Sequence, residues 1–266
     1  MINLSYYDLI DPTPYNYKDI CHIRAVTLRD ISCLENKYDT YKTYINLFSL
    51  DVEDYYKFTE QSTEDIVEIS KAFERIGKKP NIYDLISITP TLLNELIVAL
   101  NFFIVEEVAF DTSTKELCIM AVDDDGDIVP YKRFGAETYY ELIDVINQRH
   151  AVARPSQDDK IENQVFKNAR AREIWVKTHN PEVKKLRDAA NINKYNLGNI
   201  VSALTAKSKT ISIINVWDVS VFNIYDQFDR IRVNAVDEIN ARAVSIWGDS
   251  DKKYNYESWY ENRKES

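Results

Sequence analysis

Residues 211–248 read ISIINVWDVSVFNIYDQFDRIRVNAVDEINARAVSIWG, and this stretch decides the fold of the C-terminal part of the chain. Ser220 is a candidate N-cap, because a serine hydroxyl can accept a hydrogen bond from a free backbone N–H two or three residues later. The apolar side chains that follow recur at helical spacing, which predicts one helix face: Val221, Ile224, Tyr225, Phe228 and Ile231. A second amphipathic run follows and stops at Gly248, a candidate C′ residue: Val236, Ile239, Ala243 and Ile246. We predict a pair of helices that forms either a core or a docking surface.

The large apolar side chains of this stretch are the candidate partner-binding residues, because aromatic groups dominate the binding energy at the centre of protein interfaces. We predict that a protein partner contacts Trp217, Val221, Phe222, Tyr225 and Trp247. Indole rings can also stack on nucleobases, and the chain has four: Trp175, Trp217, Trp247 and Trp259. Three of the four lie within or beside apolar helical stripes, which favours burial in a core or an interface.

The composition of the 266 residues predicts an α+β protein that is mainly α-helical. Hydrophobic residues make up 45% of the chain, which is enough for a sizeable core. With only 5 glycines and 7 prolines, the chain is poor in the residues that phosphate-binding loops and turn-rich sandwiches need. The period of the apolar pattern changes between residues 105 and 134, where we predict a small antiparallel hairpin or sheet.

Three β-prone runs carry the hairpin prediction: residues 105–110, 116–122 and 128–134. Asp125-Gly126 lies between the second and third runs, and glycine accepts the positive φ of a tight hairpin turn. Residues 1–26 are rich in Tyr and predict an extended arm that packs through its aromatic side chains. Capping residues and helical periodicity predict helices elsewhere: residues 27–50, 63–76, 81–87, 89–103, 138–151 and 160–178, a short helix ending near residue 190, and residues 197–207.

The distribution of charge predicts two domains. Residues 1–153 form an acidic N-terminal helical domain that contains the hairpin, and residues 160–266 form a C-terminal helical region. Residues 154–159, RPSQDD, are the candidate linker. The first part of the C-terminal region is basic, with 11 Lys and Arg against 4 Asp and Glu over residues 160–209, although the whole chain has a net charge of −10.

This basic segment, residues 160–209, leaves a nucleic-acid or host-factor interface as an alternative. Lys184, Lys185 and Arg187 would be its phosphate-binding side chains, but Glu182 and Asp188 interrupt them. The net acidity of the chain also opposes binding to a polyanion. We therefore expect a solvated or protein-docked helix here, and no nucleic-acid partner.

No catalytic residue, cofactor or metal ion is predicted, because the chain contains no motif of a known reaction. The histidines lack metal-ligand spacing: His22, His150 and His179. Cys21-His22 resembles a nucleophile and its base only by adjacency, and adjacent side chains rarely point the same way. The cysteines form no CxxC pair, so we expect free thiols in a reducing compartment: Cys21, Cys33 and Cys118.

The densest acidic run, Asp123, Asp124, Asp125 and Asp127, predicts a solvated hairpin turn rather than a metal site. An EF-hand loop that began at Asp123 would need Gly and Glu at the places of Ile128 and Phe134.

Neither a secretion signal nor a membrane span is predicted. The N-terminus lacks a basic region followed by an apolar one. Polar residues interrupt the longest apolar run, near residues 92–110, so that it cannot span a bilayer: Asn94, Glu95, Asn101, Glu106 and Glu107. We expect a soluble cytosolic protein with no membrane partner.

Three segments resemble a protein family of tailed phages and prophages of Firmicutes. They are LSYYDLIDPTPY at residues 4–15, LNFFIVEEVAFD at residues 100–111, and LGNIVSAL…ISIINVWDVSVFNIYDQFDRI…SIWG between residues 197 and 248. The family has an NYYDL-type arm, an ALNFF-type segment and an NIWDLTVYQLWDSF-type block, and its genes lie among tail-morphogenesis genes. This chain has Phe222-Asn223-Ile224-Tyr225 where the family tends to have a Tyr-Gln-Leu-Trp run, which keeps an aromatic residue at each end.

The resemblance implies a chaperone-like role in tail assembly and brings no catalytic residues with it. Our hypothesis is a non-enzymatic factor that binds phage tail proteins, such as the tape measure or a baseplate component, in the host cytoplasm before they are incorporated. A structural virion component of the tail or baseplate is the first alternative, and a nucleic-acid or host-factor binding module is the second. Assembly into a homo-oligomer is left open.

Overall fold

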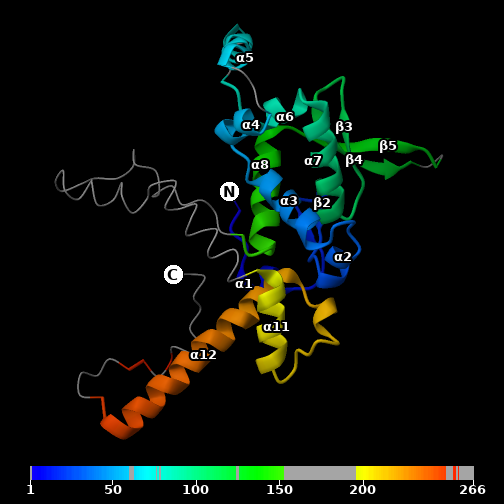
Figure 1. Cartoon of the computed structure of the whole chain (residues 1–266). Coiled ribbons are helices and arrows are strands. Elements are labelled where there is room, and N and C mark those ends of the chain that lie inside the picture. Colours follow the sequence, from blue (N-terminus) through cyan, green and yellow to red (C-terminus); the bar gives the residue numbers. More distant parts are fainter. Residues whose placement is uncertain are drawn as a thin grey trace, which may run out of the picture. The chain divides into compact units, whose positions relative to one another are not determined.

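The computed structural model describes residues 2–59, 63–75, 77, 79–123, 126–152, 196–249, 254–255 and 257. The chain divides into two compact units, Met1–His150 and Ala151–Ser266. The α+β class is confirmed, since helices predominate and the described strands form two small antiparallel sheets (Figure 1). Among the described residues, none of the helices is both long and apolar enough to cross a membrane.

The first 26 residues are more structured than the predicted extended arm. Helix α1 (Tyr6–Ile10) begins at a capping box in which Ser5 and Asp8 bond each other's backbone N–H. Strands β1 (Tyr15–Tyr17) and β2 (Cys21–Ile23) then pair antiparallel. Strands of three residues are too short for a periodic signal, which is why the pattern did not reveal them. The arm does pack through an aromatic residue, because Tyr17 is fully buried.

The helix predicted over residues 27–50 is two helices. The capping box of Thr27 and Asp30 begins α2 (Leu28–Ser32), as predicted. The chain then turns and begins again as α3 (Tyr38–Phe48), after Lys37 adopts a φ of 49° that no right-handed helix accommodates. Apolar spacing continues across this break, so periodicity alone could not show it.

The other helices of unit 1 agree with their predicted ranges within a few residues, apart from α4 (Val52–Phe58), which was not predicted. They are α5 (Thr63–Arg75), α6 (Ile82–Ser87), α7 (Pro90–Phe103) and α8 (Ala136–Arg149). Gly77, with a φ of 68°, follows α5. The core of unit 1 lies around α7, which contacts α3, α6 and the strand β3 (Val108–Asp111). Its fully buried side chains include Leu96, Leu100, Phe103, Leu142 and Ile146.

The predicted sheet near residues 105–134 is confirmed. It has the order β3 (Val108–Asp111), β4 (Glu116–Val122), β5 (Ile128–Phe134), all antiparallel. The backbone N–H of Asp123 donates to the carbonyl of Asp127, and Gly126 has a φ of 87°, so the described residues close the hairpin as predicted. Beyond Ile119 the β4–β5 hairpin extends past β3 and away from the helices of unit 1 (Figure 1).

The C-terminal end of α8 holds the N-terminal segment of unit 1. Arg149 is almost fully buried, and its guanidinium donates hydrogen bonds to the carbonyls of Asp8, Asp11 and Thr13 at 2.8–2.9 Å. Gln148 accepts from the N–H of Leu4 and donates to the carbonyl of Ile2. These bonds join residues separated by more than 130 positions in the sequence.

His150 is buried directly beside this contact. Its Nδ1 lies 3.0 Å from the hydroxyl of Tyr41, and its ring meets the edge or face of Phe103 at a centroid distance of 4.8 Å. Its Nε2 has no hydrogen-bond partner among the described residues. Burial, with a smaller contribution from the positive charge of Arg149, lowers the pKa of His150 to about 3, so the ring is neutral in the folded protein.

In unit 2, α11 (Leu197–Lys207) has its predicted range and packs against α12 (Val221–Trp247). Ser220 caps α12 by accepting from the N–H of Asn223, and Gly248 follows with a φ of 78°, as predicted. The predicted pair of helices is wrong, however, because α12 is one continuous helix of 27 residues. No Gly or Pro interrupts residues 221–247, so the two amphipathic runs are two stretches of the same helix.

Candidate protein-binding surfaces

Trp217 lies on a hydrogen-bonded loop of unit 2, in the 3₁₀ turn η3 (Val216–Asp218) between α11 and α12. Its side chain is 41% exposed, and its indole Nε1 donates to the carbonyl of Ile213 at 3.0 Å. Asn215 fixes the same loop, accepting from the N–H of Ser212 at 2.7 Å and donating to the carbonyl of Thr210 at 2.9 Å. The ring is therefore held in place although it faces solvent.

Two exposed isoleucines precede this tryptophan. Ile213 is 59% exposed, and Ile214 is more exposed still. Ile213, Ile214 and Trp217 form an apolar cluster, which we call the η3 cluster, on a loop whose backbone is fixed by side-chain hydrogen bonds. A fixed loop loses little conformational entropy on binding, which favours recognition of a partner.

The other predicted binding residues do not join one surface with Trp217. Val221 and Phe222 are buried at the start of α12 and belong to the core of unit 2, while Tyr225 is half-buried. Trp247 lies at the opposite end of the same helix and is 84% exposed. Periodicity identified the apolar face of the helix correctly but could not show which part of that face is covered.

Trp247 extends a stripe of exposed apolar side chains on the second half of α12. The stripe, which we call the α12 stripe, consists of Val236, Ile239, Ala243, Ile246 and Trp247. At 100° per residue these positions fall within one side of the helix. In Figure 1 this half of α12 extends beyond α11.

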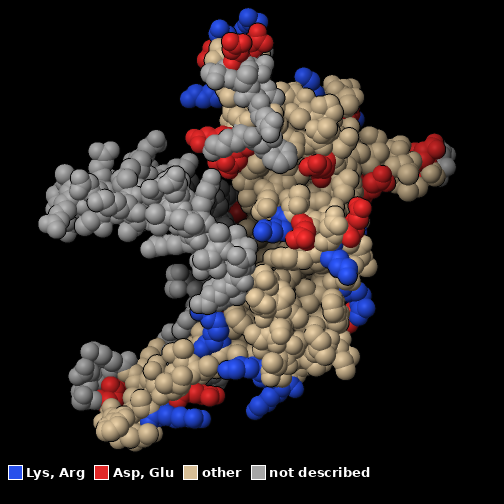
Figure 2. Space-filling view, viewed as in Figure 1, with Lys and Arg blue, Asp and Glu red and all other residues tan. Residues whose placement is uncertain are grey.

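A further apolar surface, which the sequence analysis did not identify as a site, lies on the β4–β5 hairpin. Val122 pairs with Ile128, and Met120 pairs with Pro130, so these four side chains share one face of the hairpin. Val122 and Ile128 are largely exposed, and acidic side chains lie near the tip of the hairpin (Figure 2). In the sequence, this surface could have been recognised from the uncharged residues that flank the acidic turn on both sides.

The neighbouring Cys21 and His22 do not form a catalytic pair. Strand alternation buries Cys21 and exposes His22 on the other side of β2. Burial, and to a smaller extent Glu106, raises the pKa of the Cys21 thiol to about 12, which keeps it protonated and unreactive at neutral pH. All three cysteines are free thiols.

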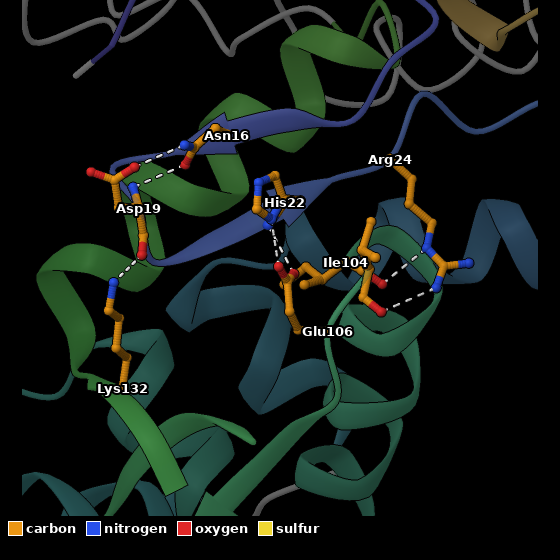
Figure 3. A network of polar contacts seen from close by, with 8 residues as sticks. Asn16, Asp19, His22, Arg24, Ile104, Glu106 and Lys132 are labelled. Carbon is orange, nitrogen blue, oxygen red and sulfur yellow. Dashed lines mark hydrogen bonds and ion pairs between the residues drawn. The ribbon is translucent and has the colours of Figure 1, made fainter. Parts of the chain in front are cut away.

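His22 instead takes part in a polar network that fastens the β1–β2 hairpin to neighbouring elements (Figure 3). The carboxylate of Glu106 accepts from the His22 backbone N–H at 2.8 Å and lies 2.5 Å from Nδ1. Desolvation raises the pKa of Glu106, but these bonds to His22 outweigh it and lower the pKa overall. Arg24 donates to the carbonyl of Ile104, and Lys132 donates to that of Asp19. These contacts hold the β1–β2 hairpin against its neighbouring elements.

Several predicted features lie outside the described residues. They are the linker at 154–159, the helices predicted between 160 and 190, the phosphate-binding candidates Lys184, Lys185 and Arg187, and also Trp175, His179, Trp259, Asp124 and Asp125. Within the part of the chain that is described, no group of three or more His, Cys, Asp or Glu side chains could hold a metal ion.

Comparison with known proteins and families places part of unit 2 in a wider context. No curated protein and no solved structure matches the chain. Residues 187–264 match a family model described as the YomV second domain. The matched range contains α11, the η3 cluster and all of α12. This match points to a phage-derived family.

Proposed function

We propose that this protein is a non-enzymatic assembly factor of a phage tail. It would hold a tail protein, such as the tape measure or a baseplate component, in the host cytoplasm before that protein is incorporated. The observation that carries the proposal is the η3 cluster, three apolar side chains exposed on a loop fixed by hydrogen bonds. The phage-derived match over the same residues supports the setting, and the resemblance of the sequence to tail-morphogenesis proteins supports the partner.

The η3 cluster has the chemistry of a protein contact. A tryptophan that is partly exposed can bury its remaining ring surface against a partner, and such aromatic anchors commonly dominate interface energies. Because the indole N–H is already bonded to the carbonyl of Ile213, it is satisfied without the partner. The partner therefore needs only an apolar pocket, and no hydrogen-bond acceptor for the ring.

The test is co-purification of tail proteins from cells that express the phage tail genes together with tagged protein. Ile213→Ser should reduce the recovery of the bound tail protein at least about tenfold, because an anchor residue contributes roughly 2 kcal/mol or more. Ile88→Ser is the matched control, since Ile88 is 50% exposed in unit 1 and Ile213 is 59% exposed. Equal recovery with both variants would contradict the proposal.

Mass spectrometry of purified virions separates the assembly factor from a structural component. An assembly factor that leaves before completion should be absent from finished particles. A constant copy number in the virion would replace the proposed role with that of a tail or baseplate component, and the η3 cluster would then be a permanent contact.

A further inference from the structure

The α12 stripe has the spacing of a coiled-coil seam. Val236, Ile239, Ala243 and Ile246 are separated by three, four and three residues, which is the alternation of a and d positions in a heptad. Val236 is 58% exposed, and Ile239 and Ile246 are more exposed. A narrow seam of this kind fits another α-helix rather than a flat surface. The partner that covers it should therefore be helical.

The size of the stripe indicates that the helix that covers it belongs to a second copy of the chain. Its large side chains are between 58% and 84% exposed, which for side chains of this size amounts to roughly 500 Å², within the range of the largest apolar patches on soluble proteins. A specific interface must bury about 1,000 Å². A second copy of the chain reaches this total, because a two-fold axis buries the same stripe, with the same area, on both molecules.

We propose that the α12 stripe pairs with the α12 stripe of a second copy, in antiparallel orientation, to form a homodimer. Antiparallel pairing about residue 241 sets Val236 opposite Ile246 of the other copy and Ile239 opposite Ala243. Each large side chain at the centre of the seam then meets a small one, which is how packed helices fill space without voids. The opposed helix dipoles also favour this orientation.

The residues that precede the stripe disfavour the parallel orientation. The same heptad spacing continues towards the N-terminus through Arg232, Asp229, Tyr225 and Phe222. A parallel partner that continued along the helix would place Asp229 opposite Asp229 and Arg232 opposite Arg232, and it would then reach Phe222, which is already buried within the chain. In the antiparallel pair, these residues of one copy lie beyond Gly248 of the other.

The ion pair of Asp229 and Arg232, with 3.2 Å between Oδ1 and Nη1, marks the N-terminal limit of the stripe. Both side chains are largely exposed, so charged groups interrupt the seam at that point. The pairing is thereby confined to about the last four turns of α12.

The first test measures dimerisation of the full-length protein by sedimentation velocity across a dilution series. The unchanged protein should form a reversible dimer. Val236→Ser should raise the dimer dissociation constant at least about tenfold, because the two-fold axis applies each lost contact twice. Val98→Ser is the matched control, since Val98 is an exposed valine on α7, 55% exposed against 58% for Val236. A protein that stays monomeric throughout, or equal effects of the two substitutions, would overturn the proposal.

The second test reports orientation by disulfide crosslinking in a Cys33→Ser background, because Cys33 is the exposed cysteine and Cys21 and Cys118 are buried. Ile239→Cys and Ala243→Cys proteins carrying different tags are oxidised alone and as a mixture. Antiparallel pairing predicts that the mixed disulfide dominates, since it joins opposed positions. Preferential crosslinking of Ile239→Cys to itself would show parallel pairing and overturn the antiparallel arrangement. Neither test uses a tail protein, so its outcome is independent of the proposed function.

Discussion

Protonation of His150 should destabilise unit 1 at mildly acidic pH. The ring is fully enclosed, contacts Phe103 and the Tyr41 hydroxyl, and is neutral in the folded protein because its pKa is lowered to about 3. In the unfolded chain the pKa returns to about 6.5, so the unfolded state binds a proton that the folded state does not. The stability is therefore complete above pH 6.5 and falls as the pH decreases towards 3.

The expected loss can be worked out from these two values. Below pH 6.5 each pH unit costs about 1.4 kcal/mol, so lowering the pH from 7.5 to 5.0 should remove about 2 kcal/mol from the free energy of unfolding. The carboxylates whose pKa is lowered by their contacts, such as Glu106 and Asp111, contribute stability that is lost only at lower pH. Between pH 7.5 and 5.0, protonation of His150 should therefore account for most of the change in the free energy of unfolding.

The assay is urea titration followed by hydrogen-exchange mass spectrometry of peptides from α7 and α8, which reports unit 1 alone. His150→Phe keeps a ring against Phe103, removes an unpaired nitrogen and loses one hydrogen bond, so its stability at pH 7.5 should change by no more than about 1 kcal/mol. Its stability should no longer fall between pH 7.5 and 5.0. His22→Phe, at the exposed histidine, should keep the fall. A His150→Phe protein with an unchanged pH dependence would refute the reasoning.

Two further predictions concern the N-terminal contact and the acidic turn. Arg149→Met should expose residues 2–14 to limited proteolysis and lower the free energy of unfolding by about 3 kcal/mol, because three carbonyls lose a charged donor. Resistance to proteolysis equal to that of the unchanged protein would show that other contacts hold the segment. Calcium or magnesium at sub-millimolar concentration should leave the melting temperature unchanged, because the Asp123–Asp127 turn is closed by its own backbone bonds; a rise of several degrees would reveal a metal site.

Local signals predicted those elements that local chemistry determines. Ser220, the Thr27–Asp30 box and Gly248 mark real helix ends, because caps depend on neighbouring backbone groups. The closure of the β4–β5 hairpin next to Gly126 could be predicted for the same reason. Such features need no knowledge of the rest of the fold.

Features that depend on distant contacts could not be predicted. Phe222 and Trp247 lie on the same amphipathic helix, yet one is buried and the other exposed, because cover is supplied by other elements and not by the helix itself. The η3 cluster shows the same limit. Ile213 and Trp217 resemble core residues in the sequence, and only the hydrogen bonds of the loop reveal that they are held at the surface.

The bonds from Gln148 and Arg149 to the N-terminal segment have a consequence for synthesis. During translation the N-terminal segment of unit 1 emerges long before α8 exists, so its backbone carbonyls have no guanidinium to accept from until Arg149, 136–141 positions later in the sequence, has been added. Contacts of such high sequence separation form late and slow the folding of a domain. Unit 1 therefore completes its fold only when its last helix turn arrives, and a chain that stops short of Arg149 leaves its own beginning undocked.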